Sequence, residues 1–130
     1  MTMKKFIIIG FSLVLLIIAA LLIWHNKKHP SDSTIRKEYL GTWVAQGAMG
    51  HSTIDIYSDG HFIAQLTGRR AGKLEGTWRV QDGFIISTYT NSSFTKHLPY
   101  SESDQVLRMN GHELVTQYGK DVFVKHKVEP

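Results

Sequence analysis

Residues 54–67 read IDIYSDGHFIAQLT and decide the fold, because two runs of alternating side chains flank an Asp-Gly pair. In the second run Phe62, Ala64 and Leu66 recur at every second position, a period that places side chains on one face of a β-strand. Asp59-Gly60 favours a tight hairpin, because both turn positions tolerate positive φ. The stretch therefore predicts two antiparallel strands with one buried face.

The same turn pattern repeats along the chain at Asp82-Gly83, Asn110-Gly111 and Gly119-Lys120. We expect strands at residues 42–46, 52–57, 61–67, 73–81, 84–90, 105–109, 112–118 and 122–127, with a weaker one at 95–98. Eight or nine short strands with short loops predict an all-β, antiparallel up-and-down meander. A two-sheet sandwich fits the same alternation, but a closed barrel is favoured because it leaves no unpaired strand edges.

An apolar run precedes these strands: residues 6–24 read FIIIGFSLVLLIIAALLIW, without a charge or a proline. At about 1.5 Å per residue, such a helix spans close to the ~30 Å of bilayer hydrocarbon. A cleaved signal peptide is the alternative, but the run ends without a small-x-small site, and Trp24 followed by Lys27 and Lys28 is typical of an interfacial end. We expect an uncleaved transmembrane helix, a signal anchor in contact with the lipid bilayer.

The flanking charges bear on localisation. Basic residues are nearly balanced on the two sides of the run, so the positive-inside count does not decide the orientation. A very short tail such as residues 1–5 usually stays in the cytoplasm. We therefore expect a single-pass protein of the cell (inner) membrane, with a cytoplasmic N-terminus and the C-terminal domain on the outer, periplasmic side.

Composition excludes several classes of function. The net charge of +4 comes from the lysines that flank the apolar run, whereas from residue 31 onward eleven basic and eleven acidic residues balance. A neutral domain argues against nucleic acid as a partner. The chain has no cysteine, which excludes disulfides, thiolate metal sites and a cysteine nucleophile.

The segment between the apolar run and the strands divides in two. Residues 25–34, HNKKHPSDST, are polar and contain Pro30, which predicts a tether. Residues 35–40 are expected to form a turn or two of helix capped by Asp32, Ser33 or Thr34. The folded domain then covers residues 35–130, enough for one modest core.

Leu40-Gly41-Thr42-Trp43, after a short helical turn, resembles the entry to the first strand of lipocalin-like domains. A strand, an Asp-Gly turn, a strand and a second Gly-Thr-Trp strand at residues 76–78 follow in the same order. The chain is similar to the small bacterial lipocalin-like (calycin-type) domains over residues 38–90, and by pattern alone beyond them. The resemblance implies a β-barrel in which Trp43 plugs one end beside a basic side chain from a late strand, Arg108 or Lys125.

The candidate ligand-binding residues are the large aromatics expected to point inward, together with one histidine: Trp43, Phe62, Trp78, Phe84 and His126. The aromatic rings can line an apolar pocket, or they can fill a small barrel. His126 faces inward if Val122 and Val124 do, because period two places all three on one face. It would then need a hydrogen-bonding partner.

Catalytic and metal motifs do not stand out. The seven histidines form no H-x-H or H-E-x-x-H pair, and the chain has no G-x-S-x-G elbow. The inward faces assigned here carry no carboxylate for acid–base chemistry. We expect a protein that is not an enzyme and uses no metal or cofactor.

Two functional hypotheses follow. In the first, the membrane-anchored, lipocalin-like domain binds a small apolar or amphipathic molecule inside the barrel. In the alternative, a filled barrel acts as a protein-interaction or accessory module of an envelope complex. An interior void beside polar groups would favour the first hypothesis, and a filled interior with an exposed apolar patch would favour the second.

Overall fold

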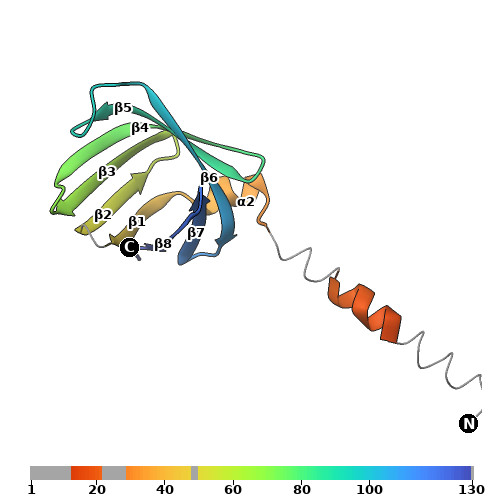
Figure 1. Cartoon of the computed structure of the whole chain (residues 1–130). Coiled ribbons are helices and arrows are strands. Elements are labelled where there is room, and N and C mark those ends of the chain that lie inside the picture. Colours follow the sequence, from red (N-terminus) through yellow and green to blue (C-terminus); the bar gives the residue numbers. More distant parts are fainter. Residues whose placement is uncertain (1–12, 22–28, 48–49, 130) are drawn as a thin grey trace, which may run out of the picture.

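The computed structural model describes residues 13–21, 29–47 and 50–129, and its strands form one closed antiparallel barrel (Figure 1). The eight strands are β1 (Gly41–Gly47), β2 (Gly50–Ile56), β3 (His61–Gly68), β4 (Gly72–Gln81), β5 (Phe84–Ser92), β6 (Tyr100–Met109), β7 (Glu113–Tyr118) and β8 (Asp121–Lys127). Each strand pairs with the next one in sequence, and β8 returns to β1. The predicted all-β, up-and-down barrel is confirmed, whereas residues 95–98 form no strand.

The hairpin expected at residues 54–67 forms between β2 and β3. Ile54 lies opposite Ala64 and Ile56 opposite Phe62, so the apolar side chains of both strands share one face. Gly60 has a φ of 91°, a conformation that glycine adopts without strain. The turn between β4 and β5 has positive φ at Asp82 and Gly83, as a type I′ turn requires.

β6 starts at Tyr100, well before the predicted residue 105. Its first half, residues 101–104 (SESD), has no apolar alternation that would mark a strand. Glu102 pairs with Ser87, and Asp104 pairs with Ile85. Ser87 and Ile85 are buried in the barrel, and cross-strand partners share a face of the sheet. The expectation that the inward faces carry no carboxylate is therefore wrong.

A short helix, α2 (Asp32–Glu38), closes one end of the barrel. The Ser31 hydroxyl caps it by accepting a hydrogen bond from the Thr34 backbone N–H. The Asp32 carboxylate accepts bonds from the backbone N–H groups of Asp82 (2.9 Å) and Gly83 (2.7 Å). The predicted tether at residues 25–34 therefore ends earlier than expected, and the helix starts before residue 35. Two hydrogen bonds fix α2 to the turn between β4 and β5.

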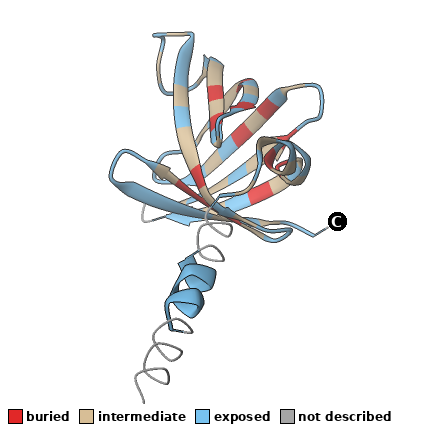
Figure 2. Cartoon of the chain, turned by 90° about the vertical axis from the view of Figure 1, so that its right-hand side faces the viewer, coloured by how far each residue is buried: buried red, intermediate tan, exposed pale blue. Residues whose placement is uncertain are grey.

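The buried core gathers at this closed end, where α2 meets the barrel. Its buried members are Ile35, Tyr39, Trp43, Ile56, Phe62, Val80, Ile85, Val106 and Leu114. Buried and exposed residues alternate along several strands in Figure 2, as one-sided burial of a sheet requires. The apolar core therefore occupies the end of the barrel that α2 closes, and the interior toward the other end is not part of this core.

The N-terminal apolar run lies partly outside the described residues. Residues 13–21 are helical and their side chains are exposed, while residues 6–12 and 22–24 of the predicted transmembrane helix lie outside the described part of the chain. Within residues 13–21, 29–47 and 50–129, no helix is both long and apolar enough to cross a bilayer.

Candidate ligand-binding cavity

A cavity of about 240 Å³ lies inside the barrel, lined by residues of β2 to β8 and by Tyr39. Its apolar lining consists of Ile54, Phe62, Ala64, Leu66, Leu74 and Phe123. Its polar lining, apart from Tyr39, consists of Ser52, Ser87, Tyr89, Glu102, Asp104, Thr116 and Lys125. The barrel is therefore not completely filled by side chains, and its cavity is lined by both apolar and polar residues.

Glu102 is held against an aromatic wall of the cavity. The Tyr89 hydroxyl donates a 2.9 Å hydrogen bond to Glu102 Oε2. The Tyr89 ring meets Phe62 edge-on, with centroids 5.4 Å apart, and stacks on Tyr100 at 5.9 Å. Burial, reinforced by the charge of Glu102, raises the pKa of Tyr89 above its usual range. The tyrosine therefore stays protonated and acts as a hydrogen-bond donor to the carboxylate.

Asp104 and Lys125 perturb each other across the cavity. Burial, with a further contribution from Glu102, raises the pKa of Asp104 to about 6, and the charge of Lys125 opposes that rise. Burial lowers the pKa of Lys125, and the charges of Asp104 and Glu102 counteract this effect. Removal from water disfavours the charged form of an acid and of a base alike. The three groups form one electrostatic unit on β6 and β8.

Thr116 adds an unpaired polar atom to the same walls. Its side chain on β7 is 1% exposed, and within the described part of the chain its Oγ1 has no hydrogen-bond partner. A buried hydroxyl without a partner costs free energy, so a bound molecule that pairs with this hydroxyl would recover that cost.

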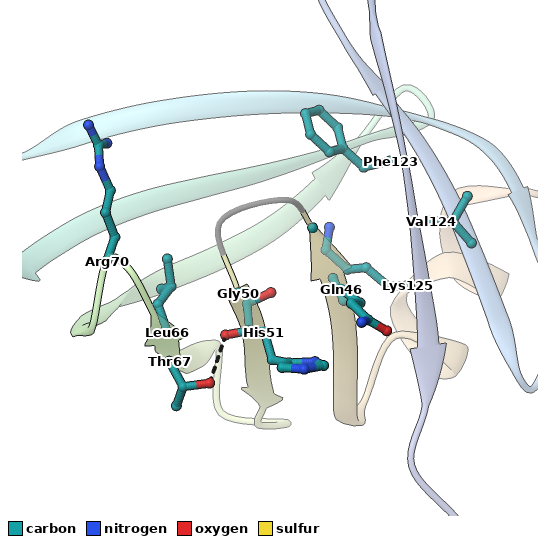
Figure 3. A pocket seen from close by; sticks show the side chains of 12 residues that line it. Gln46, Gly50, His51, Leu66, Thr67, Arg70, Phe123, Val124 and Lys125 are labelled. Carbon is teal, nitrogen blue, oxygen red and sulfur yellow. Dashed lines mark hydrogen bonds between the residues drawn. The ribbon is translucent and has the colours of Figure 1, made fainter.

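The barrel closes between β1 and β8 through a short stretch of pairing. The two strands, both described in full, pair only at Trp43 with Lys127 and at Val44 with His126. Beyond that point residues 45–47 and 121–125 have no register partner across the seam. A second hollow of about 430 Å³ lies there, lined by residues of β1, β2, β3 and β8 and by Arg70 (Figure 3).

The hollow and the inner cavity adjoin each other. Ser52, Leu66, Phe123 and Lys125 line both. Figure 3 shows Phe123 and Lys125 on one side of the β8 ribbon and Val124 on the other. The inner cavity therefore borders the hollow at the seam between β1 and β8, and Lys125 lies at this border.

Trp43 occupies the closed end. Its side chain is fully buried, and Nε1 donates a 2.8 Å hydrogen bond to the Tyr39 carbonyl. The basic partner expected from the resemblance is neither Arg108 nor Lys125. Lys127 Nζ lies 5.1 Å from the centre of a Trp43 ring and donates a 2.7 Å bond to the Glu38 carbonyl. The expected pairing of Trp43 with a basic residue exists, but its partner comes from the end of β8.

The other predicted site residues divide into two groups. Phe62 is buried and lines the cavity. Trp78 is half-buried and packs edge-on against Tyr39 with centroids 5.3 Å apart, so it belongs to the periphery of the core. Phe84 and His126 are exposed, and the prediction that they point inward is wrong.

The two errors have one cause, which is that apolar side chains were assumed to face inward. On β5 the buried residues are Ile85 and Ser87, so Phe84 lies on the opposite, outer face of the strand. On β8 Val122, Phe123 and Val124 are all exposed, but only Phe123 and Lys125 line the inner cavity. His126 shares the parity of the two valines and lies outside with them.

Sequence reasoning missed the polar lining at Tyr89, Glu102, Asp104, Thr116 and Lys125. One pattern could have found two of these residues. Val106 is an apolar residue of β6, and Glu102 and Asp104 lie four and two residues before it. Side chains two residues apart on a strand share a face, so a buried Val106 implies that both carboxylates point inward.

The described residues contain no group of three or more His, Cys, Asp or Glu side chains that could hold a metal ion. A scan of protein-family models and a search of curated proteins give no match to the chain. Fold and cavity define a closed, eight-stranded antiparallel barrel with a partly polar interior and a hollow at the seam between β1 and β8. This class is consistent with the lipocalin-like resemblance.

Proposed function

We propose that the chain is a lipocalin-like binding protein that holds a small amphipathic molecule inside its barrel and catalyses no reaction. The observation that carries the proposal is the 240 Å³ cavity with apolar walls and a buried polar group at Thr116. Ligand sites are typically concave and mostly apolar, with a few well-placed polar groups. A barrel that served only as a scaffold would be more stable with this space filled.

The cavity size limits the ligand. At about 240 Å³ it lies below the range of about 300–1,000 Å³ that is typical of ligand pockets, which favours a small ligand over a bulky polycyclic one. A short-chain amphiphile fits if its far end extends into the hollow between β1 and β8, which Lys125 and Phe123 also line. This opening is the proposed route of entry.

The test uses two tryptophan substitutions on the same strand of the full chain in phosphatidylcholine nanodiscs. Leu66 lines both the cavity and the hollow, whereas Ile63 has the opposite parity on β3. Leu66→Trp should weaken saturable binding of a small naphthyl fluorophore by about tenfold or more, and Ile63→Trp should leave it unchanged. Binding no greater than that of empty nanodiscs, or equal loss in both variants, would refute the proposal.

The proposal includes the membrane. Residues 6–24 are proposed to anchor the chain in the inner membrane, with the barrel on the periplasmic side. Because the chain has no cysteine, a single Ser93→Cys reporter on an exposed loop is specific. A membrane-impermeant maleimide should label it in spheroplasts, while alkaline carbonate should leave the protein in the membrane pellet. Release by carbonate would refute the anchor, and absence of labelling without lysis would refute the orientation.

One observation favours a second candidate, a protein-interaction module of an envelope complex. Val122 and Val124 on β8 are 55% and 44% exposed, and Val44 on β1 is 36% exposed. An apolar surface of this kind is a feature of protein contacts. A photo-crosslinker at Val122, but not at Gln65 on β3, should then give one discrete adduct in membranes. Absence of an adduct at Val122 argues against this candidate.

A further inference from the structure

The inner cavity has an excess of negative charge. Glu102 and Asp104 on β6 and Lys125 on β8 face it, so two acids oppose one base. Among the described residues, the only other titratable side chains in its lining are Tyr89 on β5 and Tyr39, and burial raises the pKa of both. Within the lining, β2, β3, β4 and β7 contribute no titratable group.

The positive charge of Lys125 is already shared between two acids. Both Asp104 and Glu102 stabilise its charged form, so one carboxylate is left without a cation of its own. Arg70 and His51 line the outer hollow but are exposed, and water screens exposed charges far more than buried ones. The uncompensated charge in the interior is therefore negative.

We propose that the cavity selects a small amphiphile with a cationic head, a primary or quaternary ammonium group, placed among Glu102, Asp104 and the rings of Phe62 and Tyr89. This inference rests on the proposed binding function and deepens it. The carboxylates supply the opposite charge, and aromatic faces attract a desolvated cation. The unpaired Thr116 Oγ1 accepts a bond from a primary ammonium N–H. The apolar tail lies along Leu66 and Phe123 toward the opening.

One further property of the site agrees with a cation. Burial and the charge of Glu102 raise the pKa of Asp104 to about 6, so the site binds a proton more tightly than an ordinary carboxylate does. A bound cation takes the place of that proton. Binding near pH 6 should therefore release protons to solution, and the number released should fall at pH 8, where Asp104 is already ionised.

An anionic head would have to use Lys125 as its anchor. Such a ligand would place a third negative charge beside Glu102 and Asp104, in a region where charges interact more strongly than in water. The positive charge of Lys125 is also already offset by the two acids that stabilise it. The charge balance of the described lining therefore favours the cation.

The experiment compares three eight-carbon amphiphiles with a cationic, a neutral and an anionic head group: octylammonium, octanol and octanoate. Each is titrated calorimetrically into the full chain in phosphatidylcholine nanodiscs, with empty nanodiscs as the blank. Octylammonium should bind about tenfold or more tightly than the other two. Repeating the titration at pH 6 in buffers with different ionisation enthalpies counts the protons released.

Matched variants assign the preference to the cavity. Glu102→Gln and Asp104→Asn keep the shape of the side chain and remove the charge, and each should reduce the octylammonium preference by about tenfold. Asp121→Asn, an exposed acid at the start of β8, should leave the preference unchanged. Circular dichroism of each variant establishes that the barrel is folded.

Each other outcome overturns a specific statement. If octanoate bound most tightly and Lys125→Met abolished that binding, Lys125 would be an anchor for anions, and the proposed selection of a cationic head group would be refuted. Equal binding of all three amphiphiles would show that the head group is not recognised, while the proposed binding function stands. Absence of binding by any of them, together with failure of the naphthyl fluorophore, would refute the binding function itself.

Discussion

The Asp32 carboxylate accepts a 2.7 Å hydrogen bond from the backbone N–H of Gly83, which fastens the closing helix to a turn far along the chain. Asp32→Ala should therefore destabilise the barrel by about 1–2 kcal/mol, because it leaves the turn donors without their acceptor. Thermal unfolding followed by circular dichroism measures the loss. Asp121→Ala, which removes an exposed carboxylate at the barrel's other end, is the control, and an equal effect of both substitutions would contradict the prediction.

A second prediction concerns Lys127 at the same end. Its Nζ lies over Trp43 and donates to the Glu38 carbonyl. Lys127→Met keeps most of the apolar stem but removes both interactions, so we expect a loss of about 1–2 kcal/mol in the free energy of unfolding. The matched substitution Lys120→Met, in the exposed turn between β7 and β8, should change it by less than about 0.5 kcal/mol. A midpoint in urea that does not move in Lys127→Met would contradict this role.

The sequence was sufficient to predict the barrel, because alternation and Asp-Gly turns are local properties. Residues 54–67 fix both the register between β2 and β3 and the inward position of Phe62. The position of α2 could not be predicted in the same way. It depends on hydrogen bonds between Asp32 and a turn that is distant in sequence, and no local pattern encodes such a contact.

The candidate site was predicted less well, since its interior is partly polar. Apolar alternation locates a face that excludes water, and it fails where Glu102, Asp104 and Lys125 point inward. The exposed Val122 and Val124 then misled the assignment on β8. Val106 identifies the inward positions of Glu102 and Asp104 only when it is known to be buried, and the inward position of Lys125 follows from the pairing of β7 with β8. Burial and strand pairing are both tertiary properties.

A third prediction concerns pH. The pKa of Asp104 is raised to about 6 in the folded state, from an ordinary value near 3.8. The folded state therefore binds the proton more tightly, and this contribution to stability is complete below about pH 3.8 and is lost as pH rises through 6. Because Asp104 is partly solvated, water weakens this effect, and we expect the free energy of unfolding to fall by about 1 kcal/mol. Chemical unfolding measured from pH 4 to 7.5 should show this decline in the wild type.

Asp104→Asn is the control for the pH prediction, since the amide cannot titrate. The difference in unfolding free energy between wild type and variant should change in favour of the variant as pH rises from 4 to 7.5. Asp59 and Glu75, whose pKa values are lowered by His61 and Lys73, are present in both proteins and cancel in the difference. A difference independent of pH would show that Asp104 titrates normally in the barrel.

The last prediction concerns the opening between β1 and β8. Pairing stops after Val44 and His126, and continuing that register would bring Gln46 opposite Val124. Both side chains are exposed and line the hollow. In the double variant Gln46→Cys, Val124→Cys, a short thiol crosslinker should close the gap and slow entry of the naphthyl fluorophore by about tenfold or more, as measured by stopped-flow fluorescence. The chain has no other cysteine, so the crosslink is confined to this seam.

A crosslink across a seam that is already paired provides the comparison. Thr53 lies opposite Gln65 between β2 and β3, and joining cysteines at these positions should leave the entry rate unchanged. Slowing by both crosslinks would indicate that general stiffening of the barrel limits entry. An unchanged rate with the crosslink at residues 46 and 124 would mean that the ligand enters elsewhere. Because pairing between β1 and β8 stops after Val44 and His126, only the first crosslink should act.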